Sequence, residues 1–329
     1  MGVTMKLLDI NAAALSYRHT LELAGARCEL RTNCSQLGAT LDRWSVADGS
    51  REHKFHMQVL VTGDEDGAPG AARFRGMHHV VIAAFSRANV FVFDLLRRNI
   101  AAAVSESIAR NPQFWDECLL PIAVGVLGAT VGVVPVHCAC LSIGDEGLLA
   151  AGVSGAGKST LTAALAQSGF DYVSDDWTYF SVKCGRLVAR GMAARMKLLP
   201  DAVSHFPILS QHSVRTSMNG ELAYEVPAES FGSRVRRFCE PRWGIFLQRA
   251  ADLSGSEFTR ASQRQARQYL ESSVERLPSQ LGDTARDRAA IIDRIAALPW
   301  WRFRYSGSPQ FAAGELRSFV ARQKQEVAV

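Results

Sequence analysis

Gly152-Val-Ser-Gly-Ala-Gly-Lys158-Ser-Thr160 is the stretch that decides the fold, because it matches the phosphate-binding loop pattern G-x-x-x-x-G-K-[ST]. The apolar residues 148–151 precede it and predict a strand, whereas 159–168 have helical spacing and end at Gly169. Strand, glycine loop and helix therefore occur in the order that such a loop requires. The alternative is a glycine-rich turn that carries a surface lysine.

Each residue type in this loop has a physical task. The glycines permit backbone angles and close approaches that a Cβ would forbid. The helix that starts near Lys158 directs the positive end of its dipole at an anion. We expect Lys158 to pair with the β- and γ-phosphates of ATP, and the Ser159 hydroxyl to bind Mg²⁺. The residues expected to bind the nucleotide are Gly152, Val153, Ser154, Gly155, Ala156, Gly157, Lys158, Ser159 and Thr160.

Two adjacent carboxylates follow the predicted helix closely. Residues 169–173 read as a short strand that delivers Asp175 and Asp176 to the end of the sheet. A metal at the loop needs a carboxylate partner, and a hydroxyl nucleophile benefits from a base. One division of labour makes Asp175 the base and Asp176 a Mg²⁺ ligand. The alternative is a solvated acidic turn.

These motifs together resemble the catalytic domain of HPr kinase/phosphorylase and its relatives. Pro135-Val-His137 precedes the loop by one hairpin, and Val173-Ser-Asp-Asp176 follows the helix, so the close match covers about 135–200. The resemblance implies an α/β fold whose P-loop nucleotide-binding core is of the phosphoenolpyruvate carboxykinase-like type. It also implies a kinase that uses ATP and Mg²⁺ to phosphorylate a serine of a small protein or peptide.

Carried over by position, the resemblance implies a role for three further features. His137 would lie beside the transferred phosphate, although a histidine there can also be a hydrogen-bonded core residue. Asp175 would be the base and Asp176 would lie near the metal. Lys197 falls where relatives have a basic residue, and it would touch a phosphate. The glycine-rich signature of true HPr kinases has no convincing counterpart, so neither HPr as substrate nor the reverse reaction is implied.

Other classes of P-loop protein fit less well. Leu253-Ser-Gly-Ser-Glu257 mimics the signature of ABC-transporter ATPases, but the following residues 269–278 are amphipathic and do not end in Asp-Glu. A GTPase would carry an Asn-Lys-x-Asp segment, which this sequence lacks. A kinase of a small metabolite and a nucleotide-dependent regulatory protein without turnover both stay open.

Composition limits the remaining possibilities. The chain has 329 residues, of which 47% are hydrophobic and 21% charged, as expected for a folded soluble protein. A net charge of +5 without a recognisable module does not indicate nucleic-acid binding. Seven dispersed cysteines and the lack of a secretion signal favour the cytoplasm. The expected partner is a phosphoacceptor protein, peptide or small molecule, and the resemblance allows a homo-oligomer.

One apolar stretch has the length of a membrane span. No Asp, Glu, Lys or Arg occurs over 118–144, but prolines and glycines interrupt it. We therefore expect a buried helix over about 115–130 joined to a buried strand, and no membrane partner.

The remaining pattern divides the chain into a strand-rich region, 1–110, and a P-loop catalytic domain, 111–329. In the first region we expect strands at 28–32, 55–62, 79–84 and 90–93, and helices at 33–43 and 95–109, the second ended by Asn111-Pro112. In the second region we expect an irregular segment at 201–235 that covers the acceptor. The other elements expected there are strands at 137–143, 147–151 and 300–305, a hairpin of 177–182 with 187–190, and helices at 260–275, 283–297 and 312–324.

Overall fold

The computed structural model describes residues 14–47, 52–63, 70–192, 195–217, 220–274 and 285–327. Its contacts divide the chain into two compact units, one of residues 1–134 with 276–288 and one of 135–275 with 289–329. The division lies at 134/135, whereas the sequence suggested 110/111. Residues 111–134 belong with the first unit because their side chains contact its sheet.

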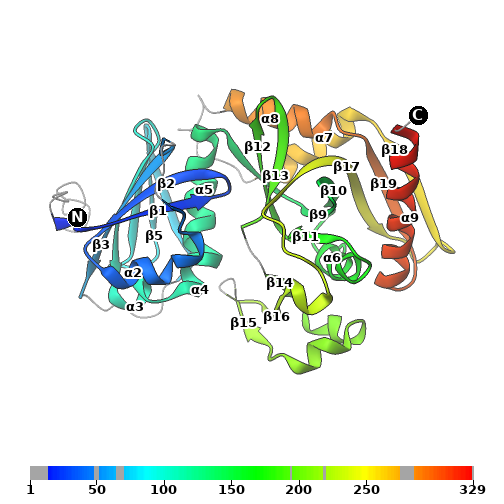
Figure 1. Cartoon of the computed structure of the whole chain (residues 1–329), viewed down its shortest axis with the longest axis horizontal. Coiled ribbons are helices and arrows are strands. Elements are labelled where there is room, and N and C mark those ends of the chain that lie inside the picture. Colours follow the sequence, from blue (N-terminus) through cyan, green and yellow to red (C-terminus); the bar gives the residue numbers. More distant parts are fainter. Residues whose placement is uncertain are drawn as a thin grey trace. The chain divides into compact units, whose positions relative to one another are not determined.

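Seven strands form the mixed sheet of the first unit (Figure 1). The pairs β2–β3 and β3–β7 are parallel and the other pairs are antiparallel. In spatial order the strands are β1 (Tyr17–Leu23), β2 (Ala26–Thr32), β3 (Phe55–Thr62), β7 (Asn99–Ser105), β6 (Val90–Asp94), β5 (Val80–Ala84) and β4 (Arg73–Met77).

Short helices accompany this sheet: α2 (Ser35–Thr40), α3 (Glu106–Ala109), α4 (Pro112–Phe114) and α5 (Leu120–Leu127). Phe114 packs edge-on against Phe85, and Trp115 packs edge-on against Phe91 of β6. Within the described residues, one helical run, Pro112–Val131, is long and apolar enough to cross a bilayer, and 56% of it is buried inside the protein. The core helix of a globular unit meets the same criteria.

The predicted helix at 95–109 is wrong. Residues 99–105 form β7, a central strand that pairs with β3 on one side and β6 on the other. Alanine favours helix locally, but pairing on both edges of a buried strand outweighs that preference. Asn111-Pro112 also starts a helix rather than ending one, because the Asn111 side chain accepts a hydrogen bond from the Phe114 amide.

A nine-stranded sheet forms the centre of the second unit. Its main path runs β11 (Asp171–Ser174), β9 (Ala139–Ile143), β10 (Glu146–Ala151), β17 (Phe238–Arg249), β13 (Arg186–Arg190), β12 (Trp177–Lys183) and β8 (Val133–His137). β19 (Trp300–Tyr305) also pairs with β17, and β18 (Ser256–Ala261) pairs with β19.

Strand direction brings the predicted site residues to one edge of this sheet. β10, β17 and β19 are mutually parallel, and β9 is antiparallel to both β10 and β11. The carboxyl ends of β10, β11, β17 and β19 therefore share an edge, and β9 begins there. Ligands in open α/β sheets bind outside the carboxyl ends of the strands.

Helices cover both faces of the sheet (Figure 1). On one face, α6 (Lys158–Gln167) and α9 (Pro309–Val327) share a core with Trp301, Phe303 and Tyr305 of β19. On the other face, Trp300 donates its indole N–H to the Ile295 carbonyl of α8 (Ala285–Ala296), and Tyr269 of α7 (Gln263–Ser272) contacts Phe246. Successive β19 residues therefore point to opposite helix layers, as strand geometry requires.

The segment predicted to be irregular at 201–235 is partly ordered. β14 (Arg195–Leu198), β16 (Leu222–Pro227) and β15 (Arg215–Thr216) form a small antiparallel sheet, accompanied by short 3₁₀ turns at Pro200–Ser204, Pro207–Gln211 and Ala228–Phe231. Phe206 and Phe231 are buried and pack edge to face, so the segment joins the core of the second unit. Aromatic anchors of this kind carry no local pattern in the sequence.

Most other predicted elements of the second unit are confirmed. The hairpin of β12 and β13 turns at Cys184 and Gly185, both with positive φ, and β19 has the predicted bounds. α8 agrees with the predicted helix at 283–297, of which residues 283–284 lie outside the described residues. α7 is shorter than the predicted helix at 260–275, because residues 260–261 end β18 and Ser262 caps the helix. α9 starts three residues earlier than predicted, at Pro309.

Candidate active site

The glycine loop connects β10 to α6, as its sequence predicts. Gly155 has φ of +78° and Gly157 has φ of +89°, so both adopt the left-handed conformation that favours glycine. Gly152 is needed for a close approach, since a Cβ there would lie 3.0 Å from the Ala156 Cβ and 3.1 Å from the Leu247 carbonyl oxygen. The loop thus passes tightly over β17 before α6 begins.

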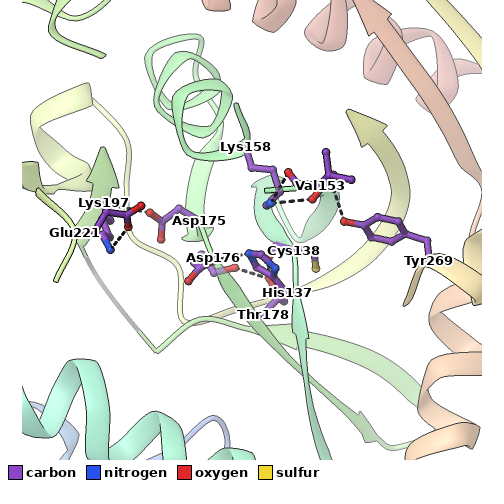
Figure 2. Close-up of polar contacts among 12 residues, drawn as sticks. His137, Cys138, Val153, Lys158, Asp175, Asp176, Thr178, Lys197, Glu221 and Tyr269 are labelled. Atoms are coloured by element: carbon purple, nitrogen blue, oxygen red, sulfur yellow. Dashed lines mark hydrogen bonds and ion pairs between the residues drawn. The ribbon is translucent and has the colours of Figure 1, made fainter. Parts of the chain in front are cut away.

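Lys158 is the first residue of α6 and folds back over the loop (Figure 2). Its Nζ donates to the Gly152 carbonyl at 2.9 Å and to the Val153 carbonyl at 3.4 Å. Only 8% of Lys158 is exposed, and burial lowers the pKa of its ammonium while the negative charge of Asp176 opposes that effect. The loop therefore holds a largely buried positive charge whose present partners are neutral carbonyls.

The remaining loop residues differ in exposure. Val153, Ser154 and Gly155 at the tip are exposed, and Val153 is 73% exposed despite its apolar side chain. Ala156 is buried, whereas Ser159 and Thr160 in the first turn of α6 are half-buried. The tip amides and the start of α6 are thus open to an incoming anion.

A residue that sequence analysis missed holds the start of the loop. The Gly152 amide donates to the Tyr269 hydroxyl at 2.6 Å, and the Tyr269 ring contacts Phe246 at a centroid distance of 4.8 Å. The residue that caps the end of α7, the helix of Tyr269, also contacts β8, because the His137 amide donates to the Ser273 carbonyl at 3.1 Å. Tyr269 lies 117 residues from Gly152, so no local pattern could have identified it.

Asp175 follows β11 and is 5% exposed. Its Oδ1 accepts from the Tyr172 hydroxyl at 2.9 Å, and its Oδ2 accepts from the Lys197 amide at 2.8 Å. Burial raises the pKa of Asp175 to about 6, against the lowering effect of these two hydrogen bonds, and the charge of Asp176 adds to the rise. Two hydrogen bonds therefore orient the carboxylate, and its pKa lies well above that of an ordinary aspartate.

The side chains of Asp176 and His137 contact each other near Lys158 (Figure 2). The His137 Nε2 lies 2.7 Å from the Asp176 Oδ1, and the imidazole stacks on Trp177 with a centroid distance of 5.4 Å. The Asp176 side chain is 58% exposed. The structure therefore brings into contact two residues of the predicted site that lie 39 positions apart in the sequence.

Buried hydroxyls hold the backbone around this pair. The Ser174 and Thr178 side-chain oxygens lie 2.6 Å apart, and the Thr178 hydroxyl donates to the Cys138 carbonyl at 2.7 Å. These bonds tie the strands on either side of the acidic pair to the residue after His137. Gly191 adds a close approach, since a Cβ there would lie 1.7 Å from the Val173 carbonyl oxygen at the end of β11.

The ammonium of Lys197 contacts a carboxylate that was not part of the predicted site, rather than lying beside Lys158. Its Nζ pairs with Glu221 Oε2 at 2.7 Å, and only its backbone amide contacts Asp175. A contact between its ammonium and a phosphate would require this ion pair to open.

The donor atoms at the site suit Mg²⁺. Within the described residues, no group of three His, Cys, Asp or Glu side chains could hold a metal ion alone. Mg²⁺ at nucleotide sites is typically bound by one or two protein oxygens, substrate phosphates and water. The Ser159 hydroxyl and the exposed Asp176 carboxylate are hard oxygen donors of that kind, so the residues present fit the ion.

Comparisons with known proteins give little further information. No family model matches this chain, and no curated protein matches its sequence. Among solved structures, the Hpr(Ser) kinase/phosphatase from Coxiella burnetii matches with a TM-score of 0.32 and 13% identity, over 58% of this chain and 98% of that chain. A likeness this slight supports no inference about the site.

Proposed function

We propose that this protein is an ATP- and Mg²⁺-dependent kinase that transfers the γ-phosphoryl group to the serine hydroxyl of a peptide or small protein. The convergence of Lys158, Asp175, Asp176 and His137 at one sheet edge carries this proposal. The effect of the Asp176 charge on the pKa of Lys158 supports it further, because a kinase site needs both signs of charge around the phosphates.

Nucleotide binding would follow from the loop. Its amides and the N-terminus of α6 would hold the phosphates, and the Lys158 Nζ would exchange the Gly152 and Val153 carbonyls for phosphate oxygens. Ser159 and Asp176 would hold Mg²⁺, which when bound neutralises charge on the phosphates. His137 would orient the Asp176 carboxylate through the 2.7 Å contact.

Asp175 would serve as the general base. A carboxylate can accept about four hydrogen bonds, and the described contacts use one on each oxygen. A pKa of about 6 leaves Asp175 mostly ionised at neutral pH yet more basic than an ordinary aspartate. The acceptor hydroxyl would pass its proton to Asp175 while its oxygen bonds to the γ-phosphorus, and the bond from that phosphorus to the β-bridging oxygen would break to release ADP.

A macromolecular acceptor is supported by the small sheet beside Asp175. The Lys197 amide of β14 contacts Asp175 directly, so the segment that follows borders the site. Four large apolar side chains are exposed within that segment: Leu199, Val203, Val214 and Leu222. If these side chains form one patch, it would suit contact with another protein or peptide, because contiguous exposed apolar surface is typical of such contacts.

Transfer of label tests the proposal. The chain is incubated with Mg²⁺ and γ-labelled ATP, together with a peptide and protein fraction or with a small-metabolite fraction. We expect phosphoserine in the macromolecular fraction with the wild type, and none with Lys158→Ala or Asp175→Asn. Label in the metabolite fraction alone would instead favour a small-metabolite kinase. Tight ATP binding without transfer to either fraction would favour a non-catalytic regulatory protein.

A further inference from the structure

We infer that Arg249 is a second phosphate-binding cation of this site, which contacts the phosphate chain of the nucleotide together with Lys158. The inference rests on the proposed function, because it names a further residue of the same nucleotide site. Arg249 is the last residue of β17, the parallel neighbour of the strand that delivers the glycine loop.

Strand alternation directs Arg249 to the face on which α6 lies. Trp243, Ile245 and Leu247 of β17 all belong to the core that includes α6 and α9. Gly244, by contrast, faces Trp300 on the opposite side, since a Cβ there would lie 2.3 Å from that indole ring. Arg249 continues the odd-numbered series at the carboxyl end of the strand, where the loop and the N-terminus of α6 are found.

A buried tyrosine lies beside the Arg249 backbone near the loop. Arg249 pairs in register with Tyr305 of β19, so both side chains project from the same face of the sheet. Burial raises the pKa of Tyr305, and the positive charge of Arg249 opposes that rise. A Cβ on Gly157 would lie 3.7 Å from the same hydroxyl oxygen. Arg249 is therefore the strand neighbour of the residue whose hydroxyl borders the N-cap of α6.

No carboxylate among the described residues pairs with Arg249, which is exposed. Arg304 at the end of β19, by contrast, pairs with both Asp252 and Glu257. The N-terminus of α6 and Lys158 are also positive, so the local field repels a further cation. A bound polyanion removes this repulsion, and a guanidinium fork matches two phosphate oxygens at once.

Affinity for phosphorylated probes tests the inference. Calorimetry measures the binding of Mg·ATP, AMP and inorganic tripolyphosphate to the wild type, Arg249→Gln, Arg249→Lys and Lys158→Ala. Arg302→Gln is the matched control, because Arg302 is an exposed strand arginine of β19 that points to the opposite face. Thermal unfolding of every variant shows whether the fold is kept.

We expect Arg249→Gln to weaken Mg·ATP and tripolyphosphate binding by about 10- to 100-fold, the usual effect of losing a charged hydrogen bond. AMP binding should change far less, Arg249→Lys should restore part of the affinity, and Arg302→Gln should match the wild type. If Arg249→Gln and Arg249→Lys both fold and bind Mg·ATP as the wild type does, while Lys158→Ala does not bind it, Arg249 has no such role and the proposed function stands. If the wild type binds neither ATP nor tripolyphosphate, both the role of Arg249 and the proposed function are wrong.

Discussion

His137 Nε2 lies 2.7 Å from Asp176 Oδ1, and this contact joins the end of β8, one hairpin before the glycine loop, to the acidic pair after it. Within the described residues, the other carboxylate oxygen of Asp176 makes no hydrogen bond, so it is available to a metal ion. The imidazole also stacks on Trp177, which restricts its orientation. Under the proposed function, Asp176 would be a metal ligand oriented by a neighbouring side chain.

His137→Ala should raise the Mg²⁺ concentration needed for half-maximal transfer by about 10- to 100-fold, because the Asp176 carboxylate loses its orienting partner. A Mg²⁺ titration of transfer activity measures this effect. His137→Gln can still donate to Asp176 and should lie between the wild type and His137→Ala. An unchanged Mg²⁺ requirement in both variants would show that His137 does not act through the metal ligand.

Asp175→Asn should keep ATP binding and lose transfer, since an amide cannot accept the proton of the acceptor hydroxyl. In the wild type, the rate should rise with pH through about 6, because the base works only when deprotonated and its pKa is about 6. A pH profile of the transfer rate at saturating ATP measures this rise. Full activity of Asp175→Asn with an identified acceptor would refute the assignment of the base.

The raised pKa of the same carboxyl should also make the free energy of unfolding fall as the pH rises. The pKa of Asp175 is raised from 3.8 to about 6, so the folded state holds its proton over a pH range in which the unfolded state has lost it. Stability contributed by this group is therefore complete below pH 3.8 and is lost as the pH rises through 6. The loss should reach about 3 kcal/mol, because each tenfold change in an acid dissociation constant corresponds to about 1.4 kcal/mol.

Denaturant unfolding of the wild type and Asp175→Asn at several pH values isolates this effect. The free energy of unfolding of the wild type, relative to that of Asp175→Asn, should fall between pH 4 and pH 7. A constant difference over that range would mean that burial does not raise the pKa of Asp175 in the folded protein.

Tyr269→Phe should weaken ATP binding by about 10-fold and leave the fold intact. The substitution keeps the ring against Phe246 but removes the hydroxyl that accepts the Gly152 amide, a hydrogen bond worth about 1 kcal/mol or somewhat more. Calorimetry and thermal unfolding measure the two quantities, with Tyr224→Phe on β16 as the control. Equal ATP affinities of wild type and Tyr269→Phe would show that the loop keeps its shape without this bond.

The sequence predicted the elements whose signals are local. The glycine loop, β10, α6, β11 and the acidic pair follow one another within 31 residues, and each has its own turn or spacing signal. Central pairing of β7 could not be predicted, because one of its two partners, β3, lies far from it in the sequence. Tyr269 was missed for the same reason, since its contact with Gly152 spans 117 residues and depends on how α7 packs. The inferred role of Arg249 likewise depends on the register of β17 with β19.

Crystallisation of the protein with Mg²⁺ and a non-hydrolysable ATP analogue tests the central claim most directly. We predict that the analogue's phosphates lie in the glycine loop with Lys158 turned away from the Gly152 carbonyl and onto them. Mg²⁺ should then be coordinated by Ser159 and Asp176, with Asp175 facing the terminal phosphoryl group. A complex in which the acidic pair points away from the phosphates, with no metal between Asp176 and the nucleotide, would contradict the kinase assignment.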